Sequence, residues 1–307
     1  MQNEKVAVTL KKIAVVSIVV VTFGVFIYYL ATHPKLLNTI TTLNPGILVL
    51  LTIGYTLFTI VNSIVLFASL KFLSRNVSFL ENILLTGYSS IVNFFGPLQS
   101  GPGFRAIYLK KRHNVSFKDF IITSLIFYLF FALINSLILT VAAVITLSLI
   151  PLLVAITVGL VVLFVASSIL KKRQPDMLNR FLKKTRLHNP YFWLIGLGAL
   201  ALCVVTTLTY WVELYHVNPS VTAAQAMVYT SAANLSLFVS LTPGAIGFRE
   251  AFLLLSEQLH HIPQTTIIGA SVIDRAFYVM FLLILFVILL IVNSRKRLGI
   301  IGTKSRE

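Results

Sequence analysis

The chain has 307 residues, of which 57% are hydrophobic and only 11% are charged. This composition excludes a soluble globular protein and indicates a polytopic membrane protein. The net charge of +16 would suit a nucleic-acid-binding protein. The basic residues, however, stand in short loops between apolar runs, so we expect no nucleic-acid partner. The single Cys203 lies inside an apolar segment and allows neither an intramolecular disulfide nor a thiolate metal cluster.

Six apolar runs are long enough to cross a bilayer, which takes about 20 helical residues. In chain order they are residues 13–31, 46–70, 120–141, 147–170, 191–211 and 265–292. Two further segments, residues 82–109 and 221–259, are interrupted by Pro and Gly. Backbone broken at membrane depth is tolerated only where protein or a wet cavity satisfies its polar groups. We therefore expect each interrupted segment to form a re-entrant helical hairpin. The first run is retained as a span, because it lacks the features of a cleaved signal peptide.

The distribution of Lys and Arg predicts the topology, because cytoplasmic loops accumulate these residues. With both termini in the cytoplasm, nearly all of the 25 basic residues lie inside, Lys35 lies outside, and Arg105, Arg249 and Arg275 lie within the membrane. The first hairpin then enters from the inside and the second from the outside. We predict one all-α membrane domain over residues 1–307, in the plasma or inner membrane. It has about six transmembrane helices and two re-entrant hairpins in an inverted repeat, with halves of approximately 1–143 and 144–307.

The two interrupted segments share a motif. Residues 88–103 align without a gap on residues 229–244, and the identities fall on Tyr, Ser, Asn, Pro and Gly rather than on Leu or Val. An arginine follows the Pro-Gly break in each copy, Arg105 in the first and Arg249 in the second. Secondary transporters built from inverted repeats have their sites between such broken elements. Channels also use paired hairpins, so the architecture alone names no activity.

We expect Arg105 and Arg249 to bind a phosphate together. Each should stand near a helix N-terminus, where a cation is unfavourable unless an anion is also present. A guanidinium fork and the backbone N–H groups near Gly103 and Gly247 suit a phosphate. The alternative is structural, with an arginine paired to an acidic side chain of the last span or of its own helix.

Three more charged residues of the membrane region are candidates for recognising a cationic headgroup or carrying a proton, namely Glu250, Asp274 and Arg275. The alternative is that Arg249–Asp274 and Glu250–Arg275 ion pairs hold the structure together. Glu250 and Glu257 are seven residues apart, a spacing that predicts one helical face.

Polar side chains at helical spacing predict a wet interior. One such row is Thr52, Tyr55, Thr59 and Asn62, and another is Thr206, Tyr210 and Glu213. The residues that we expect to line the site are Asn62, Ser90, Asn93, Tyr210, Ser231 and Asn234. Hydrogen bonding between helices is the alternative role for such side chains.

Signatures of known enzymes are missing, including the His-Glu-x-x-His, Gly-x-Ser-x-Gly and Walker motifs and any zinc-binding His/Cys cluster. We therefore expect neither a cofactor nor a metal. Arg, Asp and Glu alone can still build an intramembrane transferase, so catalysis stays open. A transporter is the preferred prediction.

The stretch Pro243-Gly244-Ala245-Ile246-Gly247-Phe248-Arg249-Glu250-Ala251, with Asp274-Arg275 in the last span, resembles the lysylphosphatidylglycerol synthase transmembrane-region family. This family of flippase-like domains commonly has Gly-Gly where this chain has Gly244-Ala245. The resemblance implies translocation of a lipid or handling of a lipid-linked phosphate. It does not imply synthase activity, which belongs to members with an added soluble aminoacyl-transferase domain.

The chain should be a flippase that moves an anionic phospholipid or a lipid-linked phosphate between leaflets, with membrane lipids, including polyprenyl-type phosphates, as its partners. An intramembrane transferase acting on a lipid phosphate is one alternative, and an ion channel or small-anion transporter is another. Homo-oligomerisation is left open.

Overall fold

The computed structural model describes residues 43–95, 100–146, 189–238, 245 and 248–296, together with Gly24, Tyr28, Ala31 and Thr32. The described residues confirm the all-α prediction, and nine helices have assigned bounds. In chain order these are α3 (Pro45–Phe72), α4 (Phe79–Phe95), α5 (Gly101–His113), α6 (Phe117–Ile145), α9 (Pro190–Val217), α10 (Ala223–Ser236), α11 (Phe248–Leu255), α12 (Glu257–His260) and α13 (Gln264–Lys296).

Four helices of the described part of the chain are long and apolar enough to cross a membrane, namely α3, α6, α9 and α13. They contain the predicted spans 46–70, 120–141, 191–211 and 265–292, and each helix extends past its predicted ends. The predicted spans 13–31 and 147–170 lie outside the described residues, apart from Gly24, Tyr28 and Ala31. Large apolar side chains such as Leu133 and Leu137 are exposed on the outside of these helices, as lipid contact requires. The chain is a multi-pass membrane protein.

The helices α3 and α9 begin in the same way and have the same length of 28 residues. Asn44 accepts a hydrogen bond from the backbone N–H of Gly46 at 2.8 Å, and Asn189 accepts one from Tyr191 at 3.0 Å. A proline follows each asparagine, where its missing N–H costs nothing. Local sequence therefore determines where both helices start.

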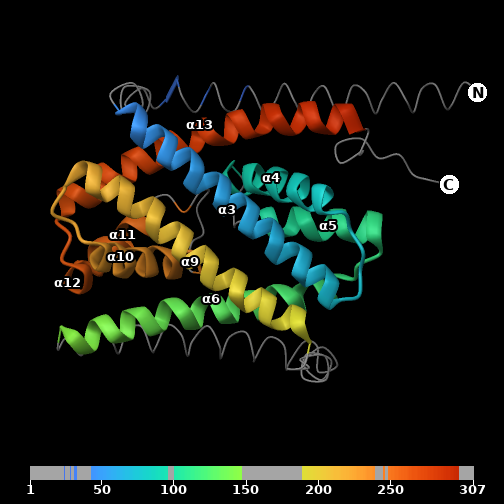
Figure 1. Ribbon diagram of the computed structural model, residues 1–307, viewed down its shortest axis with the longest axis horizontal. Helices are drawn as coiled ribbons and strands as arrows, with labels where there is room; N and C mark the ends of the chain where they lie inside the picture. Colours follow the sequence, from blue (N-terminus) through green and yellow to red (C-terminus); the bar gives the residue numbers. More distant parts are fainter. Residues whose placement is uncertain are drawn as a thin grey trace, which may run out of the picture.

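Figure 1 shows α3 and α9 crossing the molecule diagonally, with α13 along one edge and α6 along the opposite edge. Small residues allow α3 and α9 to approach closely. A side chain at Gly54 would collide with Thr209, and the Cβ of any residue at Gly198 would lie 2.5 Å from Cγ2 of Val65. Small residues at such contacts are typical of helix packing in membranes.

The helices α4 and α5 lie side by side and run in opposite directions (Figure 1). Near the break, the backbone N–H of Gly101 bonds to Oδ1 of Asn93 at 3.3 Å, and a Cβ at Gly101 would lie 2.7 Å from the carbonyl oxygen of Ser89. At the other end, Glu81 accepts a hydrogen bond from the Tyr108 hydroxyl at 2.5 Å. The two helices are therefore joined at both ends.

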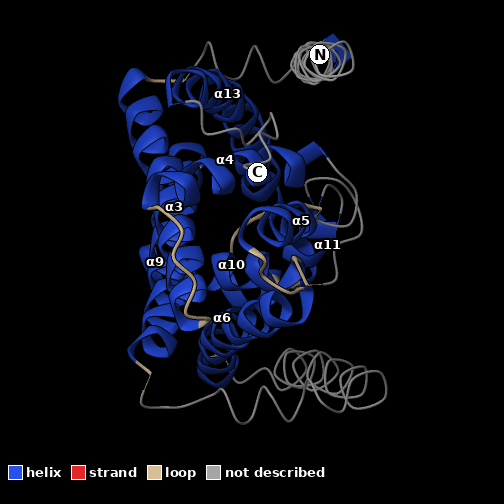
Figure 2. Cartoon of the chain, turned by 90° about the vertical axis from the view of Figure 1, so that its right-hand side faces the viewer, coloured by secondary structure: helices blue, strands red, loops and turns tan. Residues whose placement is uncertain are grey.

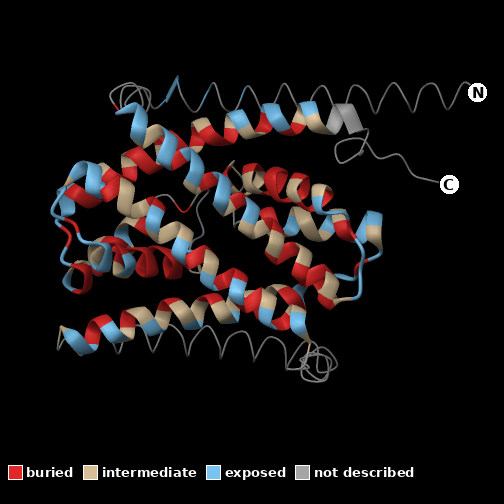
Figure 3. Cartoon of the chain, in the orientation of Figure 1, coloured by how far each residue is buried: buried red, intermediate tan, exposed pale blue. Residues whose placement is uncertain are grey.

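The helix α10 also packs against the segments that follow it, α11 and α12. It starts at the opposite end of the molecule from α4, as Figure 1 shows, so the two broken segments point toward each other. Figure 3 shows α10 buried over most of its length. End-on, in Figure 2, α5 and α11 lie across the molecule from α3 and α9. The re-entrant placement in a membrane and the inverted repeat stay predictions.

One local prediction is wrong. Glu250 and Glu257 do not share a helical face, because α11 ends at Leu255 and a separate short helix starts at Glu257. The Glu257 carboxylate instead accepts a hydrogen bond from the Gln264 amide at 3.0 Å. The interruption at Ser256 breaks the seven-residue register on which the prediction depended.

Candidate functional site

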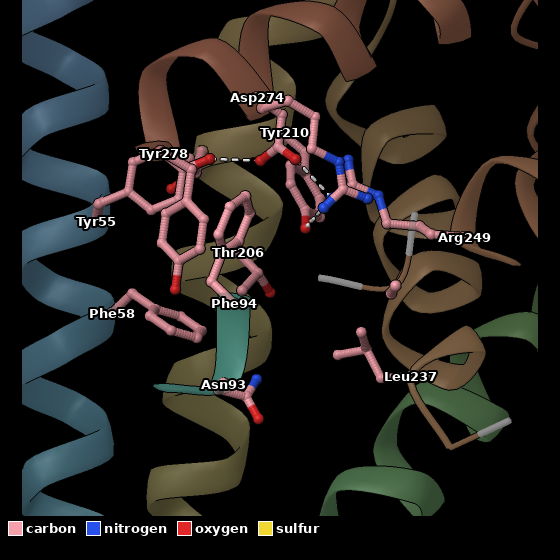
Figure 4. A pocket seen from close by; sticks show the side chains of 13 residues that line it. Tyr55, Phe58, Asn93, Phe94, Thr206, Tyr210, Leu237, Arg249, Asp274 and Tyr278 are labelled. Carbon is pink, nitrogen blue, oxygen red and sulfur yellow. Dashed lines mark hydrogen bonds and ion pairs between the residues drawn. The ribbon is translucent and has the colours of Figure 1, made fainter. Parts of the chain in front are cut away.

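Two neighbouring cavities lie where the broken segments meet the long helices. The first has a volume of about 160 Å³ and is lined by side chains of α3, α4, α9, α11 and α13. Figure 4 shows these side chains converging from different helices. The main polar members of its lining are Tyr55, Tyr210, Arg249, Asp274, Arg275 and Tyr278.

The first cavity holds a buried ion pair. Nη1 of Arg249, at the start of α11, lies 2.6 Å from Oδ2 of Asp274 on α13, and the two side chains are 7% and 6% exposed. The same nitrogen donates to the Tyr210 hydroxyl at 3.3 Å, and the guanidinium carbon lies 4.9 Å from the centre of the Tyr210 ring. This is the ion pair that the structural alternative predicted. Phosphate binding by Arg249 stays a prediction.

The ion pair does not use the whole guanidinium. Nε and Nη2 of Arg249 are buried and have no hydrogen-bond partner among the described residues. A buried donor without a partner costs about 1–3 kcal/mol, and more for a charged group. Arg249 therefore has N–H groups with which it can bind a second anionic acceptor beside Asp274.

A second ion pair joins the next residue of each helix. Nη2 of Arg275 lies 3.1 Å from Oε1 of Glu250, with side chains 12% and 27% exposed. The pair Arg249-Glu250 on α11 thus faces Asp274-Arg275 on α13 with complementary charges. Two adjacent ion pairs hold the start of α11 against α13, which positions the helix that follows the second break.

A third carboxyl group belongs to the first site. The Tyr55 hydroxyl of α3 bonds to Oδ1 of Asp274 and lies 3.2 Å from Oε1 of Glu213 on α9. Glu213 is only 1% exposed. One hydroxyl group therefore bridges two buried carboxyl groups from different helices.

The second cavity, of about 210 Å³, contains the other predicted arginine. Arg105 lines it together with hydroxyl and amide side chains of α3, α4, α6, α10 and α13. Its Nε donates to Oγ of Ser89 at 2.6 Å. No acidic side chain of the described residues forms an ion pair with Arg105. Ser89 is neutral, so this contact does not balance the charge of the guanidinium.

The two cavities share part of their lining. Phe58, Asn93, Leu237 and Tyr278 border both. We call these four shared residues the partition; Arg249 lines the first of the two cavities and Arg105 lines the second.

Five of the six polar side chains that we expected to line the site border one or both cavities. Asn93 borders both cavities, Tyr210 borders the first, and the second includes Asn62, Ser90 and Asn234. Several of these also bond locally: Asn234 donates to Oδ1 of Asn135 at 3.0 Å. Ser231 borders neither cavity, and its hydroxyl donates to the carbonyl of Met227 at 2.9 Å. Gly103 borders neither cavity, and Gly247 lies outside the described residues.

Two residues of the first site, Glu213 and Tyr55, were missing from the predicted site residues. Both stood in the predicted polar rows, and neither was assigned to the site. The reason is the predicted end of the span at residue 211, which left Glu213 in a loop. The helix α9 continues to Val217 and buries this carboxyl group. Its spacing of three from Tyr210 was the signal that could have found it.

Comparison with known families gives a match over most of the chain. The family model described as Lysylphosphatidylglycerol synthase TM region matches residues 12–285, a range that includes every residue of both cavities. Comparison with curated proteins finds no match.

Proposed function

Because the chain belongs to the lysylphosphatidylglycerol synthase TM region family, we propose that it moves an anionic phospholipid or a lipid-linked phosphate between the two leaflets of the membrane. The family's description names a lipid product and a membrane region, and the match lies within the membrane region alone. Lipid handling is therefore proposed here without the synthase reaction.

One observation carries the proposal, the charge of Arg105. Its guanidinium borders the second cavity and has no carboxylate partner among the described residues. Arg105 is half-buried, and a cation partly removed from water within a membrane is costly unless it is paired, so an anion beside it is favoured. The Tyr128 side chain lines the same cavity, and its hydroxyl is a donor that suits a phosphate oxygen.

Arg249 offers a second place where the phosphate can bind. Arg249 borders the adjoining cavity and has two N–H-bearing nitrogens without a partner in the described part of the chain. A phosphate that crosses the shared partition would exchange one arginine for the other. The charge of the headgroup then stays compensated on both sides, which is the main energetic requirement for carrying it through hydrocarbon.

The arrangement of the helices suits alternating access. The pairs α4–α5 and α10–α11 start at opposite ends of the molecule (Figure 1), and in transporters with inverted repeats such broken elements border a central site. We propose that both termini are cytoplasmic, so that the Lys- and Arg-rich end of α5 faces the cytoplasm.

Leaflet exchange in reconstituted vesicles tests the function. The probe is fluorescent phosphatidylglycerol in the inner leaflet, which becomes open to an external quencher only after exchange. Arg105→Lys keeps the positive charge but loses the paired N–H donors of the guanidinium, and we expect lipid exchange to slow by about tenfold or more. Arg75→Lys, in an exposed loop, is the matched control and should leave the rate unchanged.

The same vesicles separate the alternatives. A new lipid species in the extract, without leaflet exchange, would indicate a transferase. Ion current without lipid movement would indicate a channel. If folded protein moves neither phosphatidylglycerol nor a polyprenyl phosphate, the transport proposal is wrong.

A further inference from the structure

The hydroxyl of Tyr55 has one hydrogen but two carboxyl neighbours. It bonds to Oδ1 of Asp274 and lies 3.2 Å from Oε1 of Glu213. A hydroxyl can donate that hydrogen to one carboxylate, and toward the other it can only accept. Acceptance requires a hydrogen on the second carboxyl group. The geometry is therefore satisfied in full when one of the two carboxyl groups is protonated.

Charge balance identifies the protonated carboxyl group. Asp274 has Arg249 at 2.6 Å, whereas Glu213 has no ion-pair partner among the described residues. Both carboxyl oxygens lie within one hydrogen bond of the same hydroxyl, so two negative charges here would repel each other strongly. An unpaired buried carboxylate is also costly by itself. Protonation of Glu213 removes both penalties.

The other groups near Glu213 leave this assignment unchanged. Besides Tyr55 and Asp274, the titratable or charged side chains of the described residues that face it are Tyr210 on its own helix, Tyr229 of α10, Arg249 of α11 and Arg275 of α13. Both arginines are paired with other carboxylates, and the tyrosines are neutral. The helix α6, which also packs against α9, contributes Tyr128 to the other cavity.

We propose that Glu213 carries a proton in this conformation and that the Tyr55 hydroxyl relays it to Asp274, which releases Arg249. In the relay the O–H bond of Glu213 breaks as a new O–H bond forms on the Tyr55 oxygen. The original Tyr55 hydrogen moves to Oδ1 of Asp274. Glu213 becomes a carboxylate, Asp274 becomes a neutral acid, and the total charge is unchanged.

The relay affects substrate binding because it releases Arg249. This step rests on the transport function proposed above. With Asp274 neutral, the guanidinium loses its anionic partner and binds a substrate phosphate more strongly. Glu213, now an unpaired carboxylate, draws a new proton from the end of the molecule where α9 finishes, about one helical turn away. When the phosphate leaves Arg249, Asp274 releases its proton to the solvent and pairs with Arg249 again. Each cycle then moves one proton with one phosphate.

The proton on Glu213 is testable without any transport. A protonated carboxyl group has an infrared C=O stretch that a carboxylate lacks, and this band shifts in D2O. We expect such a band at pH 7 in purified protein in lipid, and we expect Glu213→Gln to remove it. Glu257→Gln, which removes a carboxylate of α12 outside both cavities, should leave it intact. Absence of the band, or its persistence in Glu213→Gln, overturns the proposal.

The relay is tested by the exchange of fluorescent phosphatidylglycerol across vesicles with an imposed pH gradient. We expect the gradient to change the wild-type rate severalfold, and Tyr55→Phe to abolish that dependence while keeping the Glu213 band. The ring still packs on Phe277 and Tyr278, so folding should be preserved. Tyr88→Phe is the matched control, because the Tyr88 hydroxyl is buried without a partner among the described residues.

The two sets of results distinguish the proposals. A Glu213 band without any lipid exchange supports the proton site and contradicts the transport function. Lipid exchange that ignores the gradient in wild type and in Tyr55→Phe overturns the relay and leaves the transport function standing.

Discussion

At the scale of single residues, variants of the Arg249–Asp274 pair distinguish two roles of Arg249, phosphate binding and a purely structural contact. Arg249→Ala leaves Asp274 buried without a cation, and we expect a loss of about 3–5 kcal/mol in the free energy of unfolding. Adding Asp274→Ala should restore the folded yield, measured by size-exclusion chromatography and thermal unfolding. Leaflet exchange should remain lost in the double variant, because the phosphate has lost its arginine. Restored exchange would mean that Arg249 is only a structural partner.

At the scale of helices, Glu81 joins the first turn of α4 to the C-terminal part of α5. Its carboxylate bonds to the Tyr108 hydroxyl at 2.5 Å and to Nε2 of His113 at 2.8 Å, and lies 3.3 Å from Nε of Arg112. Burial raises the pKa of Glu81, but the hydrogen bonds from His113 and Tyr108 and the nearby positive charges outweigh it and lower the pKa overall. The carboxylate form therefore stabilises the pair that contains Arg105.

Removing this contact should destabilise α4 and α5 in a pH-dependent way. Because the folded pKa of Glu81 is lowered, its contribution is complete at neutral pH and is lost as the pH falls through that pKa. We expect Glu81→Gln to lower the free energy of unfolding by about 2 kcal/mol at pH 7. The difference from wild type should shrink in acid. Thermal unfolding between pH 7 and pH 3 measures this, and a constant difference across that range would contradict the assignment.

At the scale of the whole molecule, the predicted topology assigns each end of the helical bundle to one side of the membrane. Ser220→Cys follows α9 and should react with an impermeant thiol reagent added to intact cells. Asn76→Cys follows α3 at the opposite end and should react only after permeabilisation. Cys203 is buried and should contribute no background. The reverse pattern would invert the orientation.

The sequence predicted most of the long helices and much less of the pairing between them. Long apolar runs are local features, so the first residues of α3 and α9 were predicted to within one residue, whereas α9 continues six residues past its predicted end. The choice between phosphate and Asp274 as the partner of Arg249 depends on how α11 packs against α13. Spacing along the chain does not encode that packing. Ala245 has a positive φ of 58°, which glycine adopts more easily and which matches the Gly-Gly typical of the family.

The partition between the two cavities has an electrical consequence. Three of its four members, Phe58, Leu237 and Tyr278, present mainly carbon, and only Asn93 offers an amide. A boundary lined mainly by carbon holds water poorly, and a bare ion that enters it loses its hydration shell without replacement. The partition should therefore insulate the membrane against leakage. For the proposed lipid substrate we expect a different outcome, because its headgroup remains attached to acyl chains in the bilayer and would find an arginine in each of the two cavities.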